Sequence, residues 1–203
     1  LMLMPDRDGK LIFDKATIDK IISDATAVVL GNGAGKSDEI AEIAFYIARN
    51  FERTLVLDAD ALNSIAGREN ELSGHKCKLV LTPHVGEFSR LVGGQIEGDC
   101  LKKVITYAKI LDAVVCYKSA TTVITDGERV RFNLTGTPAL AKGGSGDVLA
   151  GIIGAFSCVL PPFEAAVAGC YHFGFAGERA AKRLGTVTSV LASDVIIDLK
   201  YAK

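Results

Sequence analysis

Apolar runs without polar alternation mark the first half of the chain. Four of them, each short and rich in Val and Leu, span residues 27–31, 54–58, 78–82 and 113–118. Strands that are covered on both faces have this pattern, because both sides of the sheet then lie against apolar groups. The runs therefore predict parallel strands inside a layered α/β structure.

Helical patterns occupy the segments between these runs. The clearest covers residues 37–50, where Ser37 can cap the helix and acidic residues occupy the first turn. Weaker amphipathic patterns cover residues 85–92 and 98–111. The alternation of strands and helices predicts a doubly wound α/β sheet.

The second half of the chain has a different pattern. Residues 121–132 predict a hairpin, with Asp126 and Gly127 as a two-residue turn at positive φ. This hairpin would add an antiparallel edge to the sheet. From Gly144 onward the chain is mostly helical, with an alanine-rich stretch at residues 164–184.

Length and charge narrow the functional classes. A chain of 203 residues suits one domain, residues 1–203. The net charge of −1 comes from 23 basic and 24 acidic residues without a basic stripe, which argues against nucleic acid as a partner. No run reaches the roughly 18 apolar residues of a membrane span, and no signal peptide is visible, so we expect a cytoplasmic protein that binds small molecules.

The five cysteines are odd in number, widely spaced and free of any CxxC pair. This pattern predicts reduced, buried thiols, with no disulfide and no metal site. Cys116 and Cys170 are most simply core residues, and His172 is expected to pack within its helix.

The glycine-rich stretch GNGAGKS after the first run resembles a phosphate-binding loop. The spacing of that motif requires a glycine where this chain has Leu30. The alternative is a glycine turn at the carboxyl edge of the sheet, where open α/β folds bind their ligands. We expect the backbone of this turn to face a ligand.

A second glycine-rich stretch, residues 136–155, contains more chemical information. Gly143, Gly144 and Gly146 permit close backbone approach, and the apolar run that follows predicts a helix with unpaired N–H groups at its start. Such a helix start binds anions. Asp147 beside it is either a helix cap or a general base that takes a proton from a hydroxyl, and the density of glycine favours the base.

Six segments in order resemble one family. They read GNGAG, LDADALN, LTPHVGEF, YKSATTVI, GTPALAKGGSGDVLAGIIGAF and YHFGFAGERAA, the last followed by ASDVI. Together they are similar to the ADP/ATP-dependent NAD(P)H-hydrate dehydratases of the ribokinase-like superfamily. The resemblance implies a three-layer α/β/α fold with a mostly parallel central sheet and an antiparallel hairpin at one edge.

The resemblance also implies an activity. Such an enzyme is a metabolite-repair lyase that removes water from the 6-hydroxylated form of NADH or NADPH. ADP or ATP supplies the phosphoryl group in the presence of Mg²⁺, giving AMP or ADP and phosphate. The family implies a homo-oligomer and, as a further partner, an NAD(P)H-hydrate epimerase.

The resemblance assigns roles to individual residues. Asp147 would be the catalytic base and would contact the substrate, and no residue is assigned as a direct metal ligand. The implied substrate-binding residues are Gly33, Gly35 and His84. The implied nucleotide-binding residues are Lys118, Ser119, Ala120, Thr121, Thr122, Gly144, Ser145 and Gly146. The acidic segment with Asp58, Asp60 and Asn63 would lie near the metal and phosphates.

Simpler structural roles remain open for several of these residues. His84 after a proline could cap the next helix, and Lys118 could be a solvated charge at a strand end. Asp58 and Asp60 could form a turn, and Asn63 could cap the segment that follows.

The chain departs from the family at Thr137 and Lys142, where asparagine and threonine are usual. Lys142 would add a positive charge beside the anion site, which could assist phosphate binding or compete with it. Residues 1–10 read as the end of a strand, and the family's usual N-terminal part is expected to be missing.

These departures keep two other functions open. One is a vitamin-precursor kinase of the same superfamily, which the segments TPHVGEF and DADALN argue against. The other is a non-catalytic nucleotide-binding subunit, which the intact Asp147 argues against.

Overall fold

The computed structural model describes residues 11–96 and 98–202, and its central feature is a six-stranded sheet with strand order β1-β2-β3-β4-β5-β6. The first four strands are parallel, and β5 and β6 are added antiparallel. The strands are β1 (Ala27–Leu30), β2 (Thr54–Leu57), β3 (Lys78–Leu81), β4 (Ala113–Tyr117), β5 (Thr122–Thr125) and β6 (Val130–Asn133). The predicted strands are thereby confirmed, except the strand end read in residues 1–10, which lies outside the described residues.

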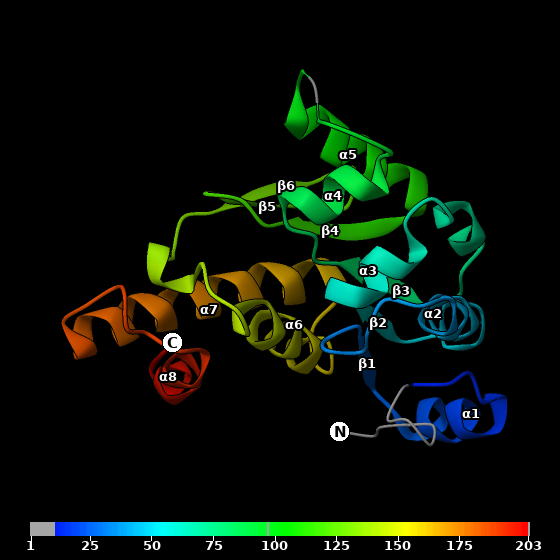
Figure 1. The fold of residues 1–203 in the computed structure, drawn as a ribbon, viewed down its shortest axis with the longest axis horizontal. Coiled ribbons are helices and arrows are strands. Elements are labelled where there is room, and N and C mark those ends of the chain that lie inside the picture. Colours follow the sequence, from blue (N-terminus) through cyan, green and yellow to red (C-terminus); the bar gives the residue numbers. More distant parts are fainter. Residues whose placement is uncertain (1–10, 97, 203) are drawn as a thin grey trace.

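Helices cover both faces of the sheet, as Figure 1 shows. The helices α6 and α7 pack on one face, while α2 and α5 pack on the other. The helices are α1 (Lys15–Asp24), α2 (Asp38–Asn50), α3 (Ala59–Ile65), α4 (Val85–Leu91), α5 (Cys100–Leu111), α6 (Ser145–Phe156), α7 (Pro162–Leu184) and α8 (Ala192–Asp198). Short 3₁₀ turns span Glu69–Leu72, Pro138–Leu140 and Leu199–Tyr201.

The buried strands divide their side chains between two cores. In β2, Leu55 and Leu57 point to the core beneath α2 and α5, while Val56 points to the core beneath α6 and α7. The residues of β3 and β4 alternate in the same way. Every second residue meets a different helical layer, so both sides of each strand must be apolar. This is the physical reason for the unbroken apolar runs.

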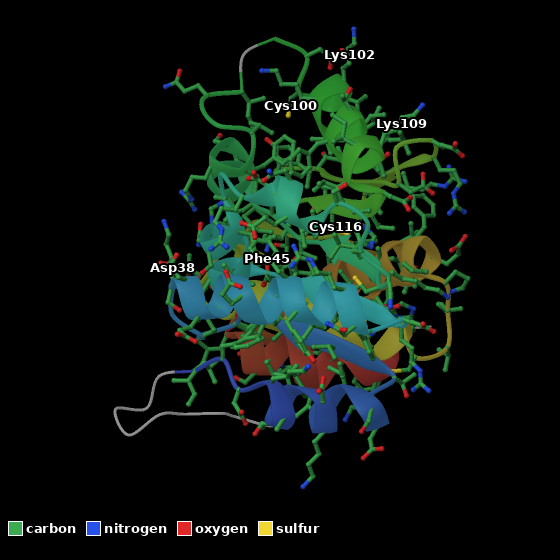
Figure 2. The ribbon with its side chains drawn as sticks, turned by 90° about the vertical axis from the view of Figure 1, so that its right-hand side faces the viewer. Asp38, Phe45, Cys100, Lys102, Lys109 and Cys116 are labelled. Carbon is green, nitrogen blue, oxygen red and sulfur yellow. The ribbon has the colours of Figure 1, made fainter. Side chains whose placement is uncertain are left out.

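Predicted helix starts agree with the structure where a side chain can cap them. Ser37 Oγ accepts a hydrogen bond from Ile40 N at 3.3 Å, and Asp99 Oδ1 accepts one from Lys102 N at 3.1 Å. Figure 2 shows α2, with Asp38 and Phe45 labelled, and α5 with Lys102. The helix α1 was not predicted, although Asp14 caps it in the same manner.

The predicted two-residue turn at Asp126 and Gly127 is wrong. Thr125 pairs with Val130, so residues 126–129 form a four-residue loop. Gly127 has φ +90°, but Asp126 does not have positive φ. The Asp126 carboxylate accepts hydrogen bonds from Glu128 N and Arg129 N instead, and this local hydrogen bonding stabilises the longer turn.

All five cysteines are free, as predicted. Cys77, Cys116 and Cys170 are buried, and Cys116 lies near the middle of the molecule in Figure 2. Cys158, however, is exposed, and Cys100 is half-buried. In the described part of the chain, no helix has both the length and the apolar character needed to cross a membrane.

Candidate active site at the carboxyl edge of the sheet

The candidate site forms where the parallel strands end. The loops after β1, β2 and β4 meet the start of α6 at this edge, and Figure 1 shows the loop after β1 beside α6. The loop after β3 joins them through the hydrogen bond of Thr82 to Asp58. Segments that are far apart in sequence therefore contribute to one site. This is the edge at which open α/β folds bind ligands.

Asp58 lies at the centre of the site and is 1 % exposed. Its Oδ1 accepts hydrogen bonds from Thr82 Oγ1 at 2.7 Å and Lys118 Nζ at 2.8 Å, and its Oδ2 accepts one from Asn32 Nδ2 at 2.9 Å. A buried carboxylate is tolerated only when it is paired in this way. Although Asp58 precedes α3, it makes no side-chain cap to that helix, so the turn-former interpretation does not describe it.

Lys118 is an internal ion-pair partner rather than a solvated charge. Its side chain is 19 % exposed, and its ammonium contacts Asp58. The backbone extends the pairing of β3 and β4, since Lys118 N donates to Pro83 O at 2.8 Å and His84 bridges to Lys118. A positive charge is thus held at the carboxyl edge of the sheet.

Asp147 occupies the first turn of α6, but it does not cap the helix. The helix begins after Gly144, which has φ +84°, and no side chain caps it. The Asp147 carboxylate instead accepts a hydrogen bond from Asn32 Nδ2 at 2.8 Å, across 115 positions of sequence. The cap interpretation is therefore wrong, and the exposed carboxylate remains available for chemistry.

The start of α6 presents free hydrogen-bond donors. Among the described residues, no acceptor pairs with the backbone N–H of Gly146 or Asp147. A Cβ placed on Gly146 would lie 3.4 Å from Lys118 Nζ and 3.5 Å from Asp58 Oδ2, so the helix start lies against the ion pair. Unpaired N–H groups and a nearby ammonium together favour an anion such as a phosphate. Gly144 and Ser145 belong to the same turn, with Ser145 buried.

The glycine turn after β1 lies across from α6. Gly33 and Gly35 both have positive φ, +64° and +79°. The N–H of Gly35 donates to Asp60 Oδ2 at 2.8 Å, so this donor is already used within the protein. Gly33 is exposed and stays the more available backbone contact for a ligand.

His84 does cap the next helix. Its Nδ1 accepts hydrogen bonds from Gly86 N at 3.0 Å and Glu87 N at 3.2 Å, and Glu87 Oε2 accepts one from His84 N at 2.8 Å. The cap uses Nδ1 and leaves Nε2 on a ring that is 54 % exposed, 3.3 Å from Glu87 Oε1. The substrate contact implied by the family stays a prediction.

The implied nucleotide segment follows Lys118 at the same edge. Ser119, Ala120 and Thr121 are exposed, and Thr122 begins β5. Ser119 Oγ donates to Thr121 O at 2.7 Å, which fixes the turn between the two strands.

Lys142 does not place its charge freely beside the start of α6, contrary to expectation. Its ammonium donates to the carbonyls of Thr188 and Val190. It therefore anchors the segment that precedes α8. Thr137 also has a local role, because its Oγ1 caps the 3₁₀ turn through Ala139 N at 3.4 Å.

Asn63 and His172 both make contacts within the protein. Asn63 lies inside α3, and its Oδ1 accepts a hydrogen bond from Arg90 Nε at 2.8 Å, so it caps no helix. His172 packs against Phe156 with ring centroids 5.0 Å apart, as expected for a packed histidine.

Another hollow lies away from the carboxyl edge of the sheet. A hollow of about 250 Å³, lined by Lys78, Ala113 and Arg129 among others, lies where β3 and β4 begin, at the opposite edge of the sheet. No cluster of three or more His, Cys, Asp or Glu side chains suited to a metal ion occurs in residues 11–96 and 98–202.

Comparison with known proteins identifies the family. A family model described as NAD(P)H-hydrate dehydratase matches residues 7–198. The chain belongs to this family. Its core, including every element of the candidate site, falls within the matched region.

Curated relatives share this family. The chain is 39 % identical over 188 residues to the bifunctional NAD(P)H-hydrate repair enzyme Nnr of Pyrobaculum aerophilum, covering 88 % of this chain and 36 % of the relative. It is 41 % identical over 180 residues to the enzyme of the same name from Methanospirillum hungatei, covering 85 % and 34 %. The dehydratase-family chain thus spans about a third of the length of these relatives.

Solved structures confirm the fold. An ADP/ATP-dependent NAD(P)H-hydrate dehydratase from Bacillus subtilis, co-crystallised with ATP and Mg²⁺, has a TM-score of 0.78 at 27 % identity and covers 90 % of this chain and 68 % of its own. A hydroxyethylthiazole kinase from Pyrococcus horikoshii has a TM-score of 0.71 at 21 % identity and covers 93 % and 75 %. The predicted ribokinase-like three-layer α/β/α fold of the dehydratase family is confirmed.

Sequence reasoning missed two residues of the site. Asn32 and Thr82 both bond to Asp58, and Asn32 also bonds to Asp147. The position of Asn32 between glycines at a strand end was a signal that its side chain faces the ligand edge. Its carboxylate partners could not be inferred, because they come from distant segments.

Proposed function

We propose that this dehydratase-family chain removes water from the 6-hydroxylated form of NADH or NADPH, with ADP or ATP as the phosphoryl donor. The observation that carries the proposal is the meeting of Asp147, the open start of α6 and the Lys118–Asp58 ion pair at one edge. A hydroxyl and a phosphate can be bound side by side there.

Asp147 is the base in this proposal. It takes the proton of the substrate hydroxyl while the hydroxyl oxygen attacks the terminal phosphorus of the donor, whose bridging oxygen leaves with AMP or ADP. The new phosphate ester then leaves as inorganic phosphate, and loss of a proton from the neighbouring ring carbon forms the double bond. The N–H groups of Gly146 and Asp147 would stabilise the transferred phosphoryl group.

The nucleotide would lie along Lys118 to Thr122, with Gly144, Ser145 and Gly146 toward its phosphates. Gly33, Gly35 and His84 are proposed for the substrate side, with Gly35 offering its carbonyl because its N–H is used. A Mg²⁺ ion would be held chiefly by phosphate oxygens and water, since Asp58 already accepts three hydrogen bonds. Its charge would offset that of the phosphates.

The curated relatives are named as bifunctional enzymes. We propose that the second activity is an NAD(P)H-hydrate epimerase, which would supply the epimer that this domain consumes. Cytoplasmic location and a homo-oligomeric assembly are also proposed, from the class of substrate and from the family.

A direct test supplies hydrated NADH, Mg²⁺ and either ADP or ATP. We expect the near-ultraviolet absorbance of the reduced nicotinamide to return, with one phosphate released per nicotinamide restored. A protein that binds nucleotide but restores no absorbance with either donor would contradict the proposal. The full-length protein should be used if the chain continues beyond these residues.

The kinase alternative predicts a different product. A vitamin-precursor kinase would release a stable phosphorylated compound and no inorganic phosphate. The fold shared with the thiazole kinase allows this reaction, while the family match and the curated relatives favour dehydration. Phosphorus NMR of the reaction mixture separates the two outcomes.

A further inference from the structure

The side chain of Asn32 joins the two carboxylates of the candidate site. Its Nδ2 donates one hydrogen to Asp58 Oδ2 at 2.9 Å and the other to Asp147 Oδ1 at 2.8 Å. We propose that Asn32 is a positioning residue that orients the Asp147 carboxylate for proton transfer. This inference rests on the proposed function of Asp147 as the base.

The orientation of the Asn32 amide is determined by its partners. Both neighbours are carboxylates, which only accept hydrogen bonds, so the NH₂ group and not the amide oxygen must face them. The two donor hydrogens of the amide are then both used. A single neutral group thereby separates two acidic side chains that would otherwise repel each other.

The loop that carries Asn32 is held rigidly on the side toward α3. Gly31 has φ +121°, and a Cβ there would lie 1.9 Å from Asp58 O. Asp60 N donates to Gly31 O at 3.2 Å, while Gly35 N donates to Asp60 Oδ2 at 2.8 Å. The backbone on both sides of Asn32 is therefore tied to the start of α3.

The far end of the network is rigid as well. Asp58 is 1 % exposed and is fixed by Thr82 and Lys118, both bound to its Oδ1. The ammonium of Lys118 compensates the charge of Asp58. Asn32 is thus held on one side by a buried, charge-compensated group, and its other hydrogen bond reaches the exposed Asp147 carboxylate.

This arrangement has a chemical consequence for Asp147. Its side chain is on an exposed residue at a helix start, where a carboxylate would rotate freely. With Oδ1 held by Asn32, Oδ2 remains available to accept the hydroxyl proton. Because the Asn32 amide is neutral, it fixes the Asp147 carboxylate without forming a permanent ion pair. The carboxylate can therefore still accept a proton.

The test compares Asn32→Ala, which removes the donor, with Asn32→Asp, which keeps the shape and replaces the donor by an acceptor. We expect kcat to fall about 10- to 100-fold in Asn32→Ala, and further in Asn32→Asp, because a misplaced catalytic group costs rate at this scale. The Kd for ADP should stay within about twofold, since the donors at the start of α6 are untouched. Asn50→Ala is the matched control, because that amide donates to Tyr46 O within α2, away from the candidate site.

A purely structural role would lower thermal stability and leave turnover per folded molecule unchanged. That result in an active wild-type enzyme would overturn the inference and leave the proposed function intact. A wild-type enzyme without dehydratase activity would instead overturn the proposed function.

Nitrogen NMR of the Asn32 side-chain amide tests the contact without any turnover. Asp147→Ala should change the chemical shift of this amide, and an unchanged chemical shift would overturn the contact.

Discussion

At the scale of single residues, the site depends on charges that are paired across distant segments. Asp58 follows β2, Lys118 follows β4 and Asp147 lies in the first turn of α6, yet one chain of contacts connects them. Lys118 compensates the charge of the buried Asp58, and Asn32 orients Asp147 through hydrogen bonds of a neutral amide. The cationic, neutral and anionic side chains of the site therefore have different electrostatic roles.

Asp147→Asn tests the base directly. The amide oxygen can still accept the hydrogen bond from Asn32, so the local geometry is preserved while the proton-accepting group is lost. We expect kcat to fall about 10²- to 10⁴-fold, the usual contribution of a general base. Nucleotide affinity, measured by calorimetry, should change little. Unchanged turnover would mean that Asp147 has no role as a base.

At the scale of elements, tight contacts between loops and helices place the site. The loop after β1 passes so close to α3 that only glycine fits at position 31. The helix α6 lies against β1 and β2, and Gly154 in this helix accommodates Val29. Small residues thus allow the glycine turn to approach α3 and the end of α6 to pack closely on β1.

Gly31→Ala should be strongly destabilising. The new Cβ would lie 1.9 Å from Asp58 O and 2.7 Å from Ala61 N, which are backbone atoms and cannot move easily. We expect the free energy of unfolding to fall by about 2 kcal/mol or more. Urea denaturation provides the measurement.

Gly67→Ala is the matched control, since Gly67 has φ +84° but open space around its Cβ position. It should cost only about 1 kcal/mol, from backbone strain alone. Equal losses in the two variants would show that strain, and not the close approach to α3, explains the need for glycine at position 31.

At the scale of the whole molecule, ion pairs link neighbouring elements. Arg183 near the end of α7 bonds to Asp194 and Asp198 of α8. The N–H of Leu191, together with Arg183, lowers the pKa of Asp194. Likewise, Arg68 lowers the pKa of Glu71, and Arg68 also reaches Glu42 on α2.

These shifts predict acid sensitivity. A carboxylate with a lowered pKa stabilises the folded state above its unfolded pKa, about 4, and this stabilisation is lost as the pH falls through the folded pKa. The free energy of unfolding should therefore decrease below about pH 4. Asp194→Asn should flatten this decrease in urea titrations at several pH values. An identical pH dependence in the variant would contradict the assignment.

The fold could be predicted largely from local patterns. Apolar runs identified β1 to β4 because both faces of these strands are buried, and Ser37 identified the start of α2 through its cap. The turn at Asp126 was wrong because side-chain hydrogen bonds favoured a longer loop over the two-residue turn. A local sequence pattern predicts an element well only when no other local hydrogen bond favours a different conformation.

The sequence by itself determined the alternation of strands and helices, the two glycine turns and the family, since these depend on residues that are close along the chain. Only the tertiary structure decided what the polar side chains do. It paired Lys118 with Asp58, turned Lys142 toward the segment before α8, and joined Asn32 to Asp147. Those pairings depend on which loops meet at the sheet edge, and that follows from the packing of both helical layers.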